Sequence, residues 1–179
     1  MKTKKLVLIL FAVLVFALII LPNKAYATES PETTEVIELC QDDFDAALEA
    51  AGAPTEKGIF YNDEYSDFCL KPGEYLFTDN IDLGENSIWI YDGAYVFDLN
   101  ENTLSSSESE ATIYLEDGNL TITGNGTITS ENHESIFLWG IVGEAAEVKT
   151  YLTIENGTFI GGITLKAAVA TIRDANVEG

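Results

Sequence analysis

The sequence predicts an all-β protein built as a solenoid of stacked parallel strands, with a short capping helix at its N-terminal end. From residue 58 onward, short runs of β-branched and aromatic residues are separated by Asn-Gly, Asp-Gly and Gly-Gly pairs, which are typical of turns. These runs align with one another at intervals near 18 to 25 residues, apart from one interval of 32. Such a period is the signature of a repeat protein in which each unit stacks on the next.

The repeat indicates which side chains face the interior. Residues 88–97 match residues 113–122 without a gap. The segment 120–122 recurs at 152–154 and at 170–172. Apolar residues recur within each unit at the period of two that a half-buried strand requires. Two other folds have short strands or short repeats. The leucine-rich repeat is not supported, because its sequence pattern L-x-x-L-x-L-x-x-N is absent. A β-sandwich would not give ungapped matches that restart at each unit. The lead strands predict one interior column of Ile88, Ile113, Ile136 and Ile163.

Residues 1–27 predict a secretory signal peptide. Three lysines precede sixteen consecutive apolar residues, 6–21, and residues 25–27 read Ala-Tyr-Ala, an A-x-A cleavage signature. We expect cleavage between Ala27 and Thr28. An uncleaved anchor is the alternative, but sixteen residues are short for a membrane span of about 20 residues. We therefore expect a secreted or cell-surface protein that is not attached to the membrane after cleavage.

Three segments follow the signal peptide. Residues 28–41 are polar and acidic at their start and predict a flexible lead-in. Residues 42–58 predict a capping helix and linker, because apolar residues recur at helical spacing after two aspartates that suit an N-cap. Residues 59–179 predict the stacked coils, with a loop at 139–150 that projects from one turn.

Two motifs in the early coils connect the chain to a known family. Residues 98–103 read Asp-Leu-Asn-Glu-Asn-Thr, and residues 118–122 read Gly-Asn-Leu-Thr-Ile. With the surrounding residues 76–130, they resemble the right-handed parallel β-helix proteins of the pectate-lyase-like superfold, above all uncharacterised bacterial surface and secreted proteins. Glu101 stands where that pattern usually has glycine. The resemblance covers residues 42–179 and implies a right-handed parallel β-helix, but the superfold includes lyases, hydrolases, adhesins and tailspikes.

The charge argues against two classes of partner. The chain has 9 basic and 30 acidic residues, a formal charge of −21, and four of the basic residues lie in the predicted signal peptide. Sequence-independent binding to nucleic acid needs clustered Lys and Arg, and anionic lipid also attracts basic segments. We therefore expect no nucleic-acid partner and no docking on a membrane.

The chain does not match the catalytic residues of enzymes with this superfold. Lyases of the superfold use a catalytic Arg or Lys, and the sole arginine, Arg173, is expected to point outward. The hydrolases combine aspartate clusters with a Gly-His-Gly motif, and the sole histidine, His133, lies in a polar turn. We expect no catalytic, cofactor-binding or metal-binding residue. Asp92 and Asp117 take the same position on successive coils, so they could together ligate calcium. The simpler interpretation is that both lie in Asp-Gly turns.

Three aromatic residues predict the candidate binding site. Trp89, Tyr114 and Phe137 lie between the inward residues of three successive lead strands and therefore form an outward row. Such rings stack on sugars or bury against a partner. One alternative is that they only stabilise the sheet as cross-strand neighbours. Another is that the loop at 139–150 covers them, and we expect its first residue, Trp139, to pack near Phe137.

The two cysteines, Cys40 and Cys69, predict a disulfide between the cap region and the first strand. Export makes such a bond permissible. Two free thiols are the alternative.

Together these features predict an exported bacterial β-helix that acts in adhesion or glycan binding without catalysis, with a polysaccharide or a host or cell-surface molecule as its partner. The alternative is the N-terminal part of a polysaccharide lyase or glycoside hydrolase whose active coils follow residue 179. Because residue 179 ends a repeat and solenoids normally carry a terminal cap, we expect further coils after it in either case, with stacking on another chain as the alternative.

Overall fold

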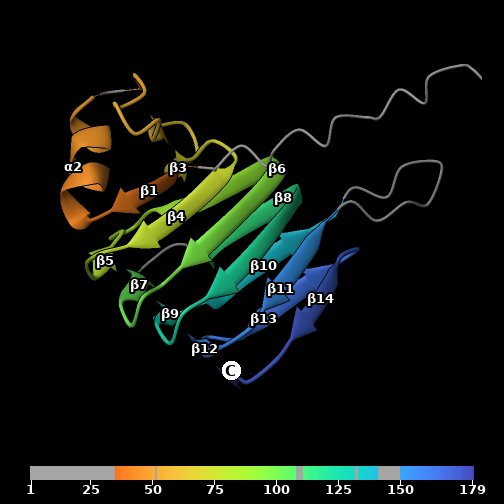
Figure 1. The fold of residues 1–179 in the computed structure, drawn as a ribbon. Helices are drawn as coiled ribbons and strands as arrows, with labels where there is room; N and C mark the ends of the chain where they lie inside the picture. The colour runs from red at the N-terminus through yellow and green to blue at the C-terminus, as the bar shows by residue number, and fades with distance from the viewer. Residues whose placement is uncertain (1–34, 51, 108–110, 132, 141–149) are drawn as a thin grey trace, which may run out of the picture. The chain divides into compact units, whose positions relative to one another are not determined.

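The computed structural model describes residues 35–50, 52–107, 111–131, 133–140 and 150–179. Strands dominate these residues, and one helix lies at their N-terminal end (Figure 1). The predicted signal peptide with its cleavage site, and most of the predicted 139–150 loop, lie outside the described residues. Among the described residues, no helix is long and apolar enough to cross a membrane.

The strands form two sheets whose neighbours run parallel, with one antiparallel hairpin among them. The first sheet has the order β1-β4-β6-β8-β10-β13, with β11 and β14 continuing from β8 and with the hairpin strand β3 beside β6. Its strands are β1 (Val36–Leu39), β2 (Phe60–Asn62), β3 (Asp67–Cys69), β4 (Gly73–Phe77), β6 (Ser87–Asp98), β8 (Ala111–Thr123), β10 (Glu134–Trp139), β11 (Tyr151–Ile154), β13 (Ile163–Lys166) and β14 (Val169–Ile172). The second sheet contains β5 (Ile81–Asp82), β7 (Thr103–Ser106), β9 (Thr127–Ser130), β12 (Gly157–Ile160) and β15 (Ala175–Glu178).

The predicted interior column is confirmed. Each member pairs directly with the next, in the order Ile88, Ile113, Ile136 and Ile163. The first three are fully buried, and they pack in a single apolar core with the inward residues of the second sheet. Strand alternation therefore sends one face of each lead strand into the core and leaves the other face outside.

Strands β6 and β8 each turn a corner without ending. At the corners, Asp92 and Asp117 adopt left-handed conformations with φ of 48° and 49°, which aspartate tolerates better than most residues. Before its corner β8 pairs with β10, and after its corner β8 pairs with β11. This geometry agrees with the interpretation of both aspartates as Asp-Gly turn residues.

The capping helix α2 spans Gln41–Glu49, beginning just before the predicted segment. Cys40 is its N-cap, and the Cys40 backbone N–H donates a hydrogen bond of 2.9 Å to the Asp43 carboxylate. This reciprocal contact satisfies a backbone donor at the start of the helix. Phe44 and Ala47 are buried and attach the helix to the end of the core.

Two N-terminal segments differ from the prediction. Residues 36–39 form β1 rather than a flexible lead-in, because Leu39 is fully buried and the strand pairs with the edge of β4. Residues 60–69 form the antiparallel hairpin β2–β3 rather than a parallel coil. The four residues between these strands are too few for a parallel crossover, which needs a dozen or more residues.

The core becomes open to solvent at the last described coil. One interior row consists of Ile90, Leu115, Leu138 and Leu165. The first three are fully buried, whereas Leu165 is 47% exposed. Ile172 pairs with the buried Ile154 and is 44% exposed, and Val177 pairs with the buried Phe159 and is 42% exposed. Burial of the same row position therefore depends on having a paired strand on both sides.

Candidate functional site

The outer face of the lead strands carries the predicted aromatic row. Trp89 pairs with Tyr114, and Tyr114 pairs with Phe137. The Tyr114 and Phe137 ring centroids are 5.8 Å apart. All three side chains are half-buried rather than fully exposed. Phe137 also lies against Trp139, with 6.3 Å between ring centroids, which confirms the expected contact of these two residues.

A second outward row, which is not among the predicted site residues, lies two residues further along the same strands. This row consists of Tyr91, Glu116, Trp139 and Lys166. The Tyr91 ring lies 5.9 Å from the Trp89 ring, and the Lys166 ammonium lies 4.3 Å from the centre of the Trp139 ring. Tyr91 and Trp139 are about half exposed. The same period of two that located Trp89 would have located this row if it had been continued by one step.

The β2–β3 hairpin adds a further aromatic side chain to this face. Tyr65 lies in its turn, is 62% exposed and has its ring centroid 6.4 Å from that of Trp89. The hairpin lies next to the row because β3 pairs with the first residues of β6. This contact was not predictable from the repeat, since the hairpin is not part of it.

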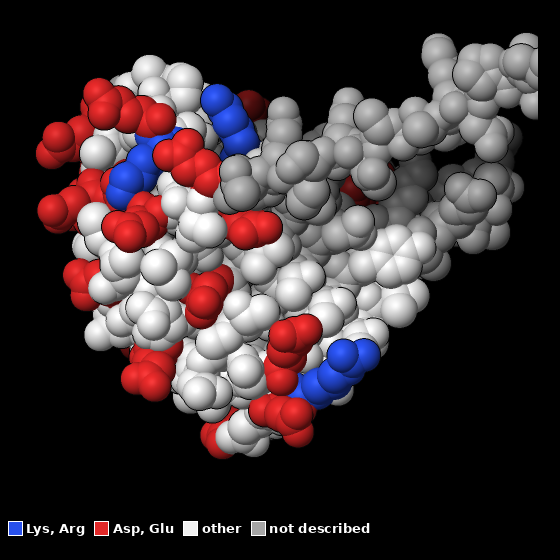
Figure 2. Space-filling model, viewed as in Figure 1, with Lys and Arg blue, Asp and Glu red and all other residues white. Residues whose placement is uncertain are grey.

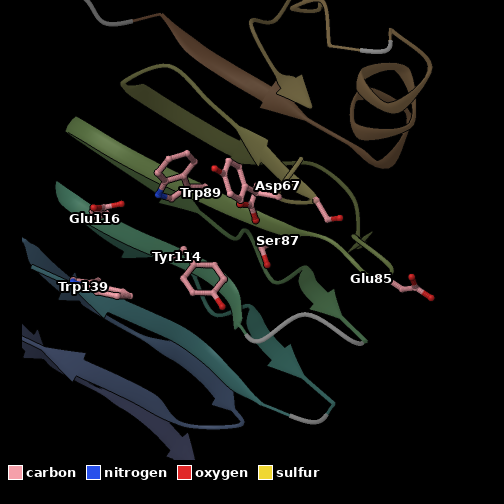
Figure 3. Close-up of a pocket in the computed structure, with 9 residues that line it drawn as sticks. Asp67, Glu85, Ser87, Trp89, Tyr114, Glu116 and Trp139 are labelled. Carbon is pink, nitrogen blue, oxygen red and sulfur yellow. The ribbon is translucent and has the colours of Figure 1, made fainter. Parts of the chain in front are cut away.

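These side chains surround an open groove of about 510 Å³ (Figure 3). Figure 3 shows Trp89, Tyr114 and Trp139 on three successive strands, with Asp67 coming from the neighbouring hairpin strand. The described residues that line the groove are Tyr65, Ser66, Asp67, Glu85, Ser87, Trp89, Tyr114, Glu116 and Trp139. Phe137, although part of the predicted row, is not among them. The groove therefore combines four aromatic side chains with three carboxylates.

The carboxylates flank the Trp89–Tyr114 pair along the strand direction. Asp67 pairs with Ser87, two residues before Trp89, and Glu116 lies two residues after Tyr114. At about 3.3 Å per residue, the two acidic positions are separated by roughly 13 Å along the strands. Burial raises the pKa of the Asp67 carboxyl to about 6.

No protein-family model, curated protein or solved structure matches this chain.

The corner aspartates do not form a larger acidic cluster. Among the described residues, no group of three or more His, Cys, Asp or Glu side chains is close enough to hold a metal ion. Asp92 and Asp117 line a separate shallow depression together with Tyr151. Calcium at this corner stays a hypothesis.

The sole histidine and the sole arginine lie away from the groove lining. His133 is exposed in the turn before β10, where its backbone N–H donates to the Ser130 hydroxyl at 3.3 Å. Arg173 is exposed between β14 and β15. Both positions agree with the expectation of turn or outward residues.

The predicted Cys40–Cys69 disulfide is not formed, and both cysteines are free. The Cys40 thiol donates to the Asp43 carboxylate at 3.2 Å at the start of α2. Cys69 lies in β3, where it pairs with Phe60 and Trp89. The two thiols thus belong to different contacts, and burial, assisted by the charge of Asp67, raises the pKa of Cys69 to about 11.

Proposed function

We propose that this chain is an exported right-handed parallel β-helix that binds a glycan in the groove on its outer face and does not cleave it. The observation that carries the glycan proposal is the groove, in which aromatic rings from the hairpin and three successive strands meet beside carboxylates. Adhesion to a polysaccharide or to a host or cell-surface glycan is the role that such a site would serve.

The repeated register supports the β-helix assignment. Each coil contributes strands before and after a corner in the first sheet and one strand in the second, and each strand pairs in parallel with its counterpart in the next coil. Side-chain columns that continue through successive coils are characteristic of solenoids, in which each repeat contacts only its neighbours.

The composition of the groove supports sugar as the ligand. Its volume of about 510 Å³ lies in the range of small-ligand sites. Aromatic faces provide flat apolar surfaces against which the C–H face of a sugar can pack, and carboxylate oxygens accept hydrogen bonds from hydroxyl groups. Half-exposed Trp139 and Tyr65 lose further solvent contact when such a ligand binds.

Binding can be tested with two groove variants and one matched control. Trp89→Ala and Trp139→Ala should each weaken binding on a glycan array by about tenfold or more, because each removes a stacking face. Tyr151→Ala removes an aromatic side chain that is 45% exposed and lies outside the groove. It should leave binding unchanged. Equal losses in all three variants, or losses that follow a lower melting temperature, would contradict the proposal.

The alternative proposal is the N-terminal part of a polysaccharide lyase or glycoside hydrolase. If the catalytic group lies among the described residues, it is Asp67, because burial in the groove raises the pKa of its carboxyl to about 6 and a protonated carboxyl can act as a general acid. Incubation of the bound glycans with the chain distinguishes the two. Release of new reducing ends or unsaturated ends, lost in Asp67→Asn, would favour the enzyme.

Export is tested independently of the ligand. The secreted protein should begin at Thr28 by N-terminal sequencing, as expected for cleavage after Ala27. A mature protein that retains residues 1–27 would contradict it.

A further inference from the structure

The groove is negatively charged as well as aromatic. Among the nine described residues that line it, three are acidic and none is Lys, Arg or His. On the face shown in Figure 2, acidic side chains are spread widely and are densest toward the end that carries α2, whereas Lys and Arg are few. The formal charge of the whole chain, −21, adds to this field.

Two of the five basic residues after residue 27 already interact through their ammonium groups with other side chains of the protein. The Lys57 ammonium lies 2.7 Å from the Asp43 carboxylate, beside α2. The Lys166 ammonium lies over the Trp139 ring at 4.3 Å. The second contact is a cation–π interaction, and it places one positive charge beside a ring that lines the groove.

We propose that the ligand of the groove is a cationic oligosaccharide, a chain of sugars that carry free amino groups. This inference rests on the proposed glycan binding. The sugar faces stack on Trp89 and Tyr114, and the ammonium groups lie against the carboxylates of Asp67 and Glu116. A polyuronate is disfavoured because its carboxylates would meet three carboxylates in the groove.

The spacing of the carboxylates sets the length of the ligand. Asp67 and Glu116 lie on strands β3 and β8, with β6 between them. Two strand spacings of about 4.8 Å across the sheet, combined with roughly 13 Å along it, separate the two positions by about 16 Å. A single sugar ring does not reach both carboxylates, so the ligand is an oligosaccharide rather than a monosaccharide.

The test compares three probes that share a chain length and differ in charge. They are oligomers of glucosamine, of N-acetylglucosamine and of galacturonate, each measured by calorimetry at low and at high salt. We expect the glucosamine oligomer to bind about tenfold more tightly than the acetylated oligomer, and this preference to shrink at high salt. We expect the galacturonate oligomer to bind most weakly.

Charge-neutralising variants assign the preference to the groove. Asp67→Asn and Glu116→Gln should each reduce the preference for glucosamine over N-acetylglucosamine by about threefold to tenfold. Glu155→Gln removes an exposed acidic side chain outside the groove lining and should leave the preference unchanged. Equal effects of all three variants would assign the preference to overall charge and overturn the inference.

The outcomes separate this inference from the proposed function. Equal binding of the acetylated and free-amine oligomers, lost in Trp89→Ala, would retain glycan binding and overturn the cationic ligand. Binding of none of these oligomers, nor of any sugar on the array, would overturn both. Binding of spermidine as tightly as the glucosamine oligomer would indicate ammonium recognition without a sugar and would also overturn the inference.

Discussion

Truncation of one leucine in the interior row should be far more damaging in the middle of the stack than at its last described coil. Leu115 and Leu165 have the same side chain and occupy the same row, but they are 0% and 47% exposed. Leu115→Ala leaves a cavity between two coils and should lower the free energy of unfolding by about 3 kcal/mol, within the usual range of 2–5 kcal/mol. Leu165→Ala removes only half-buried methyl and methylene groups and leaves no enclosed cavity.

The expected loss for Leu165→Ala follows from its exposure. Full burial contributes about 0.8 kcal/mol for each carbon removed, so three carbons at half burial contribute about 1.2 kcal/mol. Urea denaturation followed by circular dichroism measures both variants. With an m value of about 2 kcal/mol/M, the midpoint should fall by about 1.5 M for Leu115→Ala and about 0.6 M for Leu165→Ala.

A third variant checks that the difference reflects stacking rather than position in the chain. Leu138, like Leu115, is fully buried and has a coil on each side, so Leu138→Ala should resemble Leu115→Ala. Equal losses for Leu115→Ala and Leu165→Ala would refute the reasoning, because they would mean that Leu165 is as enclosed as the others in the folded protein.

Three further predictions concern a carboxyl, the thiols and a close backbone approach. Since the pKa of Asp67 rises from 3.8 in the unfolded chain to about 6 on folding, the free energy of unfolding should fall as pH rises between these values. In urea titrations, Asp67→Asn should flatten this pH dependence and raise the free energy of unfolding near pH 7 by of the order of 1 kcal/mol. Thiol titration of the denatured, unreduced chain should find both Cys40 and Cys69, and finding neither thiol would indicate a disulfide. In the folded chain, Cys69 should react slowly, because its pKa is about 11. Gly126→Ala should lower the melting temperature and the free energy of unfolding, the latter by about 1–3 kcal/mol, because the added Cβ would overlap a backbone carbonyl of the neighbouring strand segment. As a control, Gly73→Ala would place its Cβ 3.7 Å from an aromatic ring and should change the free energy of unfolding by about 0.5 kcal/mol or less. Similar effects of the two variants would contradict the close approach at Gly126.

The repeat made the parallel strands and their register predictable. Interior residues such as Ile88 and Ile113 alternate with outward residues, and the same pattern returns at the next coil, so alternation and repeat gave the same register. Trp89 and Tyr114 were located in the same way. Strand pairing at this register follows from the need to keep every inward side chain in the core, since a slip by one residue would reverse the two faces.

The features outside the repeat were not predictable by that reasoning. Residues 36–39 fall in the predicted flexible lead-in, although Leu39 enters the core from a strand that pairs with β4. Tyr65 and Asp67 reach the groove only because the β2–β3 hairpin reverses the chain and pairs with β6. The groove therefore depends on a long-range contact between an irregular N-terminal element and a regular coil, which no local pattern in the sequence encodes.

The stacking of identical row positions also makes the length of the outer face adjustable in fixed steps. Trp89 and Tyr114 lie 25 residues apart in sequence but on adjacent strands, about 4.8 Å from each other in the pairing direction. Insertion of one complete coil between them would extend the outer face by one strand spacing and preserve the register on either side. Insertion of part of a coil would instead break the interior columns. Gene duplication in whole repeats would therefore lengthen the outer face without altering the side chains at the original positions.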